Sequence, residues 1–362
     1  MRRPNGQGSI YYEKSKKRYA ASFITPEGRR IVKRFPTTEE AENWLEDNRY
    51  SIRHNTFVTP SGMRTGAWIL QYIDTYKKNV RPRTLSLYFA ILEKIEPIAD
   101  IPLQKLTGMD VQALINSLDG KISTSYIKKI YELLNMAIKK AVALDILAKN
   151  PIGTVERPKV TQKKIQIFTI DEIHQILAYA KERHRDRLYM EILVATYTGL
   201  RIGELLALTW NDITPAFIHI TKTLGQDGHG GVIYVQNATK TSHSRRDVSI
   251  PLSLYETLKE WQESTRAHGG LVFKAKNGNF LFPSNERIAF QGVQKDLGIC
   301  PIRSFHALRH THASQLLANG VPIAEVSKRL GHASPAITLT TYTSWIPGND
   351  EKVANDVERI FR

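Results

Sequence analysis

Cysteine is nearly missing from this sequence. Cys300 is the one cysteine among 362 residues, so no disulfide can form within the chain. This usage is typical of a reducing compartment, and we expect the protein in the cytoplasm. As a lone thiol before a proline, Cys300 is expected to be a small buried hydrophobic side chain rather than a nucleophile.

Long hydrophobic runs are missing too. No stretch approaches the ~20 apolar residues that a membrane-spanning helix needs, and the basic start MRRPNGQGS is not followed by the apolar segment of a secretory signal. We therefore expect no membrane partner. The sequence also lacks a phosphate-binding P-loop, a dinucleotide-type glycine motif and a convincing cluster of carboxylates for Mg²⁺. We expect neither a cofactor nor a metal.

Acidic residues are outnumbered by basic ones. Lys and Arg total 51 against 35 Asp and Glu, which gives a net charge of +16. An excess of this size indicates a polyanionic partner, most often nucleic acid. The apolar fraction of 41% is ordinary for folded protein, and the length allows two or three domains.

Residues 1–55 are predicted to form a DNA-binding domain with a small three-stranded sheet and a helix. The strands are expected in SIYY, RYAASFI and RRIVKRF, and Thr37 with Glu40 three residues later predicts the start of the helix. Basic residues cluster on and between these strands, and a charged β-ribbon can enter the major groove of DNA. We expect DNA contacts from Arg18, Arg29, Arg30, Lys33 and Arg34. A solvated charged face is the alternative.

Residues 63–152 show the apolar spacing of helices, which predicts a four-helix domain. Residues 153–167 lack such spacing, and we interpret them as an extended linker near nucleic acid, with Lys163 and Lys164 in contact with DNA. A solvated linker is the alternative. Residues 168–362 are expected to form a mixed, mainly helical domain with a small antiparallel sheet. The whole chain is thus predicted to be a multidomain α+β protein.

Five motifs in this last domain carry side chains suited to phosphate chemistry. In TGLRIGELLALTW, Arg201 follows a glycine break, and Glu204 lies one turn further on, where it can orient the guanidinium. In HALRHTHASQLLANG, His306, Arg309 and His310 share a helix face, and spacing alone does not say which imidazole acts. The other motifs are TKTSHSRRDVSIPL with Lys240, LGHAS with His332, and TTYTSW with Tyr342.

In this order the motifs resemble those of the tyrosine recombinases, the lambda-integrase-like family of site-specific DNA recombinases. They cover most of residues 168–345, and the two upstream segments fit the arm-binding and core-binding domains of an integrase. Carried over by position, the resemblance implies a set of catalytic residues in which the tyrosine is the nucleophile. The set is Arg201, Lys240, His306, Arg309, His332 and Tyr342. His310 and His312 match positions that are not catalytic in the family, so packing or polar contacts are expected of them.

The resemblance implies phosphodiester exchange without hydrolysis. The tyrosine attacks a DNA phosphate, expels a 5′-hydroxyl and holds the 3′-phosphate as an ester, which the 5′-hydroxyl of another strand then attacks. Two arginines and imidazole donors can stabilise the transition state in place of a metal. A tyrosine with an ordinary pKa of about 10 needs a base or a cationic pocket. His306 is the candidate base, and Lys240 is the candidate acid for the leaving group.

The implied partners are double-stranded DNA at core and arm attachment sites, other copies of the chain in a tetramer on DNA, a host DNA-bending protein and an excisionase. An integrase of a phage or an integrative conjugative element fits this layout best. Two alternatives remain. One is a non-enzymatic regulator, since ASQLLANGVPIAEVSKRLGHAS predicts a helix-turn-helix, and the other is a type IB topoisomerase with similar chemistry.

Overall fold

The structure is a computed structural model that describes residues 8–54, 56–161, 165–226, 233–237, 245–266, 269–342 and 357–362. The chain divides into two compact units, Met1–Gln162 and Lys163–Arg362. Helices and small sheets occur together, so the predicted α+β class is confirmed. Among the described residues, no helix is long and apolar enough to cross a membrane.

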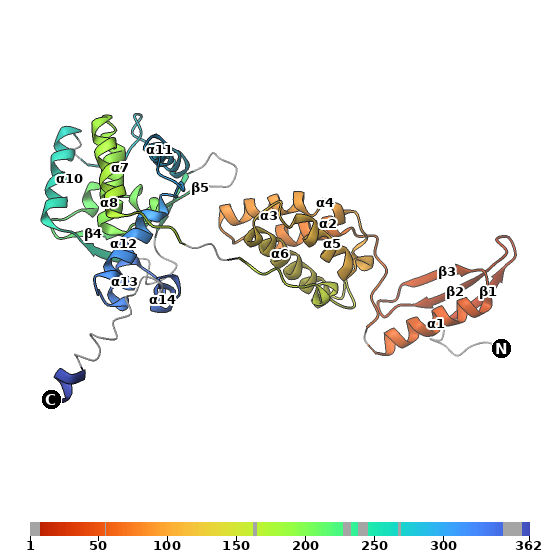
Figure 1. The fold of residues 1–362 in the computed structure, drawn as a ribbon. Helices are drawn as coiled ribbons and strands as arrows, with labels where there is room; N and C mark the ends of the chain where they lie inside the picture. The colour runs from red at the N-terminus through yellow and green to blue at the C-terminus, as the bar shows by residue number, and fades with distance from the viewer. Residues whose placement is uncertain are drawn as a thin grey trace. The chain divides into compact units, whose positions relative to one another are not determined.

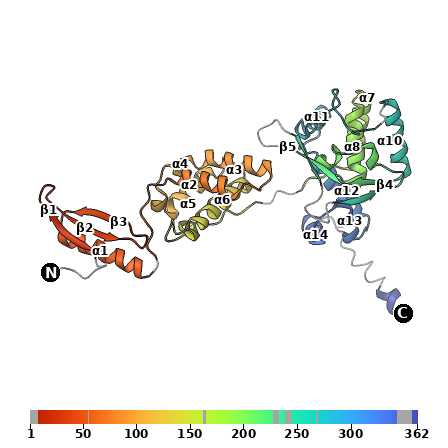
Figure 2. The same ribbon diagram turned by 180° about the vertical axis from the view of Figure 1, so that it is seen from behind.

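The first unit begins with a three-stranded antiparallel sheet and a helix along one of its faces (Figures 1 and 2). These elements are β1 (Ser9–Glu13), β2 (Arg18–Ile24), β3 (Arg30–Phe35) and α1 (Thr38–Arg53). Thr37 Oγ1 accepts a hydrogen bond from the backbone N–H of Glu40 at 3.2 Å, as the capping pattern predicted. The small core between sheet and helix contains Phe23, Phe35 and Leu45.

The face of this sheet opposite α1 is open and basic. Side chains alternate along a strand, and Phe23 and Phe35 on the helix side fix which residues face away. Three of the predicted DNA contacts share the open face, namely Arg18, Arg30 and Arg34. Lys33 lies on the other face, 5.3 Å over the ring of Phe35, and Arg29 lies in the turn before β3.

The rest of the first unit is helical and has a separate core. Its elements are α2 (Thr65–Tyr76), α3 (Pro82–Lys94), α4 (Glu96–Ala99), η1 (Leu103–Lys105), α5 (Gly108–Leu118), α6 (Thr124–Ala143) and η2 (Pro151–Thr154). The indole N–H of Trp68 donates to the carbonyl of Ala137 at 2.9 Å, which ties α2 to α6. The division into domains 1–55 and 63–152 and the linker 153–167 stay predictions, and Lys163 and Lys164 lie outside the described residues.

The second unit is mainly helical, with two antiparallel strand pairs, β4–β7 and β5–β6. Helices α7 and α8 lie between α10 and α11 in both views (Figures 1 and 2). The elements are α7 (Ile170–Glu182), α8 (Asp186–Thr198), α9 (Ile202–Leu205), η3 (Trp210–Asp212), β4 (Phe217–Ile220), β5 (Lys222–Gln226), β6 (Ile233–Asn237), β7 (Arg246–Ser249), α10 (Leu252–Ser264), α11 (Pro283–Asp296), α12 (His306–Ala318), α13 (Ile323–Leu330) and α14 (Pro335–Tyr342).

The prediction of a buried Cys300 was wrong: the thiol is exposed, because it lies in the connection between α11 and α12 rather than in either helix. The predicted helix, glycine turn and helix are present as α12, Gly320 and α13.

Candidate active site

A glycine break between α8 and α9 creates the position of Arg201. Gly199 ends α8 in the left-handed conformation, with φ of +67°. A Cβ on this residue would lie 2.7 Å from Cδ2 of His312 and 3.0 Å from Cδ2 of Leu330. Glycine therefore satisfies both the backbone conformation and the close approach to α12 and α13. The turn places Arg201 at the N-terminus of α9.

Arg201 is held by Glu204, in the contact that the spacing suggested. The carboxylate accepts the backbone N–H of Arg201 at 3.0 Å and its Nη1 at 2.8 Å. The Arg201 side chain remains 43% exposed, while that of Glu204 is 8% exposed. The buried carboxylate of Glu204 thus orients the guanidinium of Arg201, which is still accessible to an anion.

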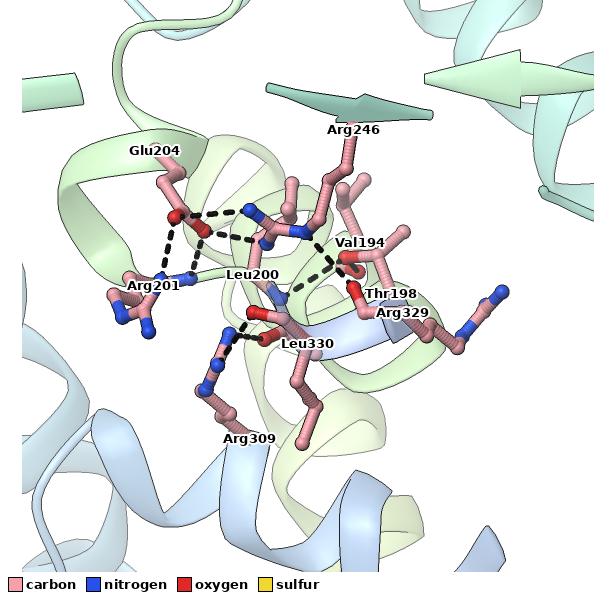
Figure 3. A network of polar contacts seen from close by, with 10 residues as sticks. Val194, Thr198, Leu200, Arg201, Glu204, Arg246, Arg309, Arg329 and Leu330 are labelled. Atoms are coloured by element: carbon pink, nitrogen blue, oxygen red, sulfur yellow. Dashed lines mark hydrogen bonds and ion pairs between the residues drawn. The ribbon is translucent and has the colours of Figure 1, made fainter. Parts of the chain in front are cut away.

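The structure adds a third member to this group that sequence reasoning missed. Arg246, on β7, donates through Nη2 and Nη1 to the two oxygens of Glu204, at 2.8 and 3.2 Å (Figure 3). Its Nε donates to the backbone carbonyl of Arg329 at 2.8 Å. The side chain is only 6% exposed. Burial acts to raise the pKa of Glu204, but the hydrogen bonds and charge of Arg246, with the charge of Arg201, lower it to about 2.

Arg309 is buried and forms hydrogen bonds with the backbone at the ends of two helices, α8 and α13. It is 2% exposed, and its Nη1 and Nη2 donate to the carbonyls of Gly199 at 2.9 Å and Leu330 at 2.6 Å (Figure 3). Burial, and next the charge of Arg201, lower the pKa of Arg309 to about 9. Arg309 therefore stays cationic near neutral pH. The two carbonyls belong to the glycine break after α8 and to the end of α13. Arg309 therefore connects the motif that contains Arg201 with the motif that contains His332.

His332 connects the end of α13 to the helix that carries the tyrosine. Gly331 ends α13 with φ of +66°, and His332 follows it. Its Nδ1 lies 2.7 Å from Oγ1 of Thr338, on α14. Burial and the charge of Arg309 lower the pKa of His332 to about 4, so the ring is neutral at pH 7.

Tyr342, the last residue of α14, is almost completely buried. It is 1% exposed and packs in a small cluster with Ala313, Leu317 and Leu330. Burial raises the pKa of the phenol to about 12, although the charges of Arg309 and Arg201 act in the opposite direction. Near neutral pH the hydroxyl therefore keeps its proton.

The hydrogen-bond partner of this hydroxyl is His310. Its Nδ1 lies 2.7 Å from Oη of Tyr342. His306, the candidate base, packs edge-to-face on His310, with 4.6 Å between ring centroids. His312 has a different role: its Nδ1 lies 2.9 Å from the carbonyl of Thr196, while its Nε2 accepts a hydrogen bond from Arg329.

The described residues thus bring together five of the six predicted catalytic positions. Lys240 lies among residues 238–244, outside the described residues. The arrangement combines fixed guanidinium groups, neutral imidazoles and a tyrosine, which suits stabilisation of a phosphoryl transition state. Among the described residues, no three His, Cys, Asp or Glu side chains are grouped to hold a metal.

Comparison with known proteins gives matches along most of the chain. Residues 166–346 match the phage integrase family, and residues 66–118 match the phage integrase N-terminal SAM-like domain. A tyrosine recombinase XerC-like protein of Caldanaerobacter subterraneus subsp. tengcongensis is 29% identical over 97% of this chain and 98% of its own. The ICEBs1 integrase of Bacillus subtilis is 28% identical over 72% of each chain.

Solved structures agree in fold. The integrase of transposon Tn1549, in complex with a circular intermediate DNA, superposes with a TM-score of 0.70 at 18% identity, over 82% of this chain and 99% of that one. Lambda integrase, as a tetramer bound to a Holliday junction, gives 0.63 at 18% identity, over 96% and 97%. On these matches and on the order of its motifs, the chain belongs to the phage integrase family, the tyrosine recombinases that cleave and rejoin DNA.

Proposed function

We propose that this chain is a site-specific integrase that cuts DNA by attack of Tyr342 on a phosphodiester. The observation that carries the proposal is Tyr342, which ends a helix packed against α13 and lies in one cluster with Leu317 of α12. On α12, Arg309 is fixed by two backbone carbonyls. The charges of both Arg309 and Arg201 act on this phenol. A phosphate bound by these two arginines would therefore lie close to the attacking oxygen.

The proposed reaction forms one bond as it breaks another. The phenolic oxygen bonds to phosphorus, the bond to the 5′-oxygen breaks, and the 3′-phosphate stays on the tyrosine. Arg201 and Arg309 stabilise the charge that spreads over the non-bridging oxygens, with His332 as a further donor. Lys240 is proposed to protonate the leaving 5′-oxygen. A 5′-hydroxyl of another strand reverses these steps, so no external energy source is required.

The proposed partners are double-stranded DNA and further copies of the chain. The solved relatives are integrases in complex with DNA, one of them a tetramer on a Holliday junction, and we infer the same for this chain. The open basic face of the sheet β1–β2–β3 supports a role in binding arm DNA. The helical part, in the region matched by the SAM-like domain, is proposed to bind core DNA. A DNA-bending protein, an excisionase and a cytoplasmic location remain parts of the proposal.

A trapping experiment tests the nucleophile. A bound duplex is first selected from a randomised library and then prepared with single nicks placed along one strand. Attack next to a nick releases a short fragment, which traps the protein on DNA. We expect an adduct on Tyr342 by peptide mapping, and for Tyr342→Phe binding without adduct, because only the attacking oxygen is lost. An adduct on another residue, or strand exchange by Tyr342→Phe, contradicts the proposal. Binding without any wild-type adduct favours a regulator.

A further inference from the structure

The imidazole that contacts the tyrosine hydroxyl is His310, the neighbour of the arginine in the H-x-x-R motif. We propose that His310 is a catalytic residue, the group that takes the proton from Tyr342 when DNA is cut and returns it when the strands are rejoined. This inference rests on the proposed role of Tyr342 as the nucleophile. Its basis is the hydrogen bond of 2.7 Å between Nδ1 of His310 and Oη of Tyr342.

The direction of this hydrogen bond follows from the two groups. Burial and the charge of Arg309 lower the pKa of His310 to about 4, so its ring is neutral at pH 7. Tyr342 keeps its proton, as described above, so the phenol can donate and Nδ1 can accept. The ring proton of His310 is then on Nε2, and Nδ1 is free to bind a second proton.

Water is poorly placed to do this work. Tyr342 is 1% exposed, and it packs in one cluster with the buried apolar side chains Ala313, Leu317, Val326 and Leu330. Two positions in an α-helix that are four residues apart lie on one face, so His306 contacts His310 along α12, edge-to-face. His306 can restrain the orientation of His310.

The protons balance in both directions. In cleavage the proton of Tyr342 moves to Nδ1 of His310, the tyrosine oxygen bonds to phosphorus, and the departing 5′-oxygen gains a proton from the proposed acid, Lys240. In rejoining, the 5′-hydroxyl gives its proton to the Lys240 amine, and the departing phenolate takes the proton from Nδ1. The histidine ends each complete cycle neutral.

Charged groups on several elements affect how readily His310 accepts a proton. Arg309 and His306 lie beside it on α12, and Arg309 lowers its pKa. His332, after α13, interacts with it electrostatically, and Tyr342 faces it from α14. When a DNA phosphate pairs with Arg309, the cation that disfavours an imidazolium is offset. Burial, the larger cause of the low pKa of His310, remains, so DNA is expected to offset only the part that comes from Arg309.

The test measures single-turnover formation of the Tyr342 adduct on the nicked duplex between pH 5.5 and 9.5. In His310→Asn the side-chain amide reaches about as far from the backbone as Nδ1, so it can still accept the hydrogen bond but cannot take the proton. His219→Asn, at an exposed position on β4 that contacts Asp247, is the matched control. Both variants are first compared with the wild type in DNA affinity.

We expect His310→Asn to bind DNA as the wild type does and to form the adduct about 100-fold or more slowly at pH 7, which is the usual scale of general-base catalysis. Its rate should rise about tenfold per pH unit, because the ionised fraction of a phenol with a pKa of about 12 rises in this way over the range, while the wild type levels off. A duplex with a 5′-bridging sulfur should not restore its rate, because the leaving group is not the defect. The same duplex should restore the rate of adduct formation by Lys240→Ala.

Two outcomes overturn the inference while leaving Tyr342 as nucleophile. One is adduct formation by His310→Asn at the wild-type rate and with the wild-type pH profile. The other is faster cleavage by His310→Ala, which would make the hydrogen bond a restraint rather than part of the chemistry. Nitrogen NMR of histidine-labelled wild-type protein gives an independent check that needs no variant. A protonated Nδ1 on neutral His310 in the DNA-free protein also contradicts the proposal.

Discussion

Glu204 is a carboxylate shared by two arginines, one buried and one accessible. Arg246 supplies the buried contact and Arg201 the accessible one. Removing a single partner from a buried ion pair leaves the other charge without compensation, and this costs far more than removing a surface pair. The carboxylate therefore orients Arg201 and also allows Arg246 to remain charged in the interior.

We expect Glu204→Gln to lower the free energy of unfolding by about 3 kcal/mol at pH 7. The ordinary pKa of a glutamate, 4.5, is lowered to about 2 in the folded protein. The ionised carboxylate hence contributes its full stability above pH 4.5, and the contribution is lost as the pH falls toward 2. Urea unfolding at pH 7, 5, 4 and 3 should show the difference from the wild type shrinking over the last steps.

Glu132→Gln provides the control for this prediction. Glu132 pairs with Arg157 at 3.3 Å, and both side chains are well exposed. Its substitution is expected to change stability by less than about 1 kcal/mol. If both variants lower the free energy of unfolding by the same amount at pH 7, the buried pair contributes no more to stability than the exposed pair.

The sequence limits the candidates for the acting arginines and histidines but does not choose among the histidines. The motif order identified Arg201 and Arg309, and a helical face grouped His306 with His310. The choice of His310 as the contact of Tyr342 depends on how α14 packs on α12 and α13, and no local pattern contains that information. Arg246 was missed for a similar reason: adjacent arginines on a strand point to opposite faces, and the sequence does not say which of the two faces the interior.

At the scale of elements, β7 connects two parts of the site. Through Arg246 it contacts Glu204 at the start of α9 and the backbone of Arg329 at the end of α13. A Cβ on Gly331 would lie 2.9 Å from Nη1 of Arg246, so this guanidinium packs directly against the turn before His332. Arg246 is a positioning residue for Arg201 and for His332.

We expect Arg246→Lys to retain DNA binding within a few-fold and to slow adduct formation by about 10- to 100-fold. A lysine keeps the charge but cannot bond both carboxylate oxygens and a carbonyl in one plane. Adduct formation on a methylphosphonate duplex, whose reacting phosphorus lacks the negative charge that Arg201 is proposed to bind, should be slowed much less. Arg245→Lys, at the exposed neighbouring position, is the control.

Equal slowing on both duplexes would mean that Arg246 acts through general stability and not through Arg201.

Elements themselves were predictable where local signals were strong: the Thr37 cap, the helical spacing of α2 and α6, and the turn between α12 and α13 all appear. The separate pairing of β5 with β6 was not predicted, because strand pairing depends on contacts distant in sequence.

At the scale of the whole molecule, the parts proposed to bind arm DNA and core DNA have separate cores. The sheet with α1 has its own buried cluster, distinct from that of the helices that follow. Two attached binding modules raise the effective concentration of each at its own site without any new contact. The benefit depends on both sites being present on one DNA.

Deletion of residues 1–55 is expected to abolish protection of arm DNA and integration of arm-bearing substrates. Adduct formation on an isolated core duplex should survive, because the proposed catalytic residues all lie beyond residue 200. Footprinting and adduct assays on the same preparations measure the two effects. Arm protection by the truncated chain, or protection of core DNA alone by the full chain, would assign another role to the first 55 residues.

Burial of Tyr342 also affects how readily water could hydrolyse the covalent link between the protein and a cut strand. In the proposed reaction the 3′-phosphate becomes esterified to the oxygen of a side chain that packs with Leu317, Val326 and Leu330. If the ring keeps this packing while DNA is attached, solvent has poor access to the linkage, and exclusion of water suppresses the side reactions of an intermediate. Hydrolysis of the ester would leave the strand broken, with a 3′-phosphate, whereas a 5′-hydroxyl of DNA restores continuity. The apolar packing around one tyrosine thus favours resealing over damage for as long as the strand stays open.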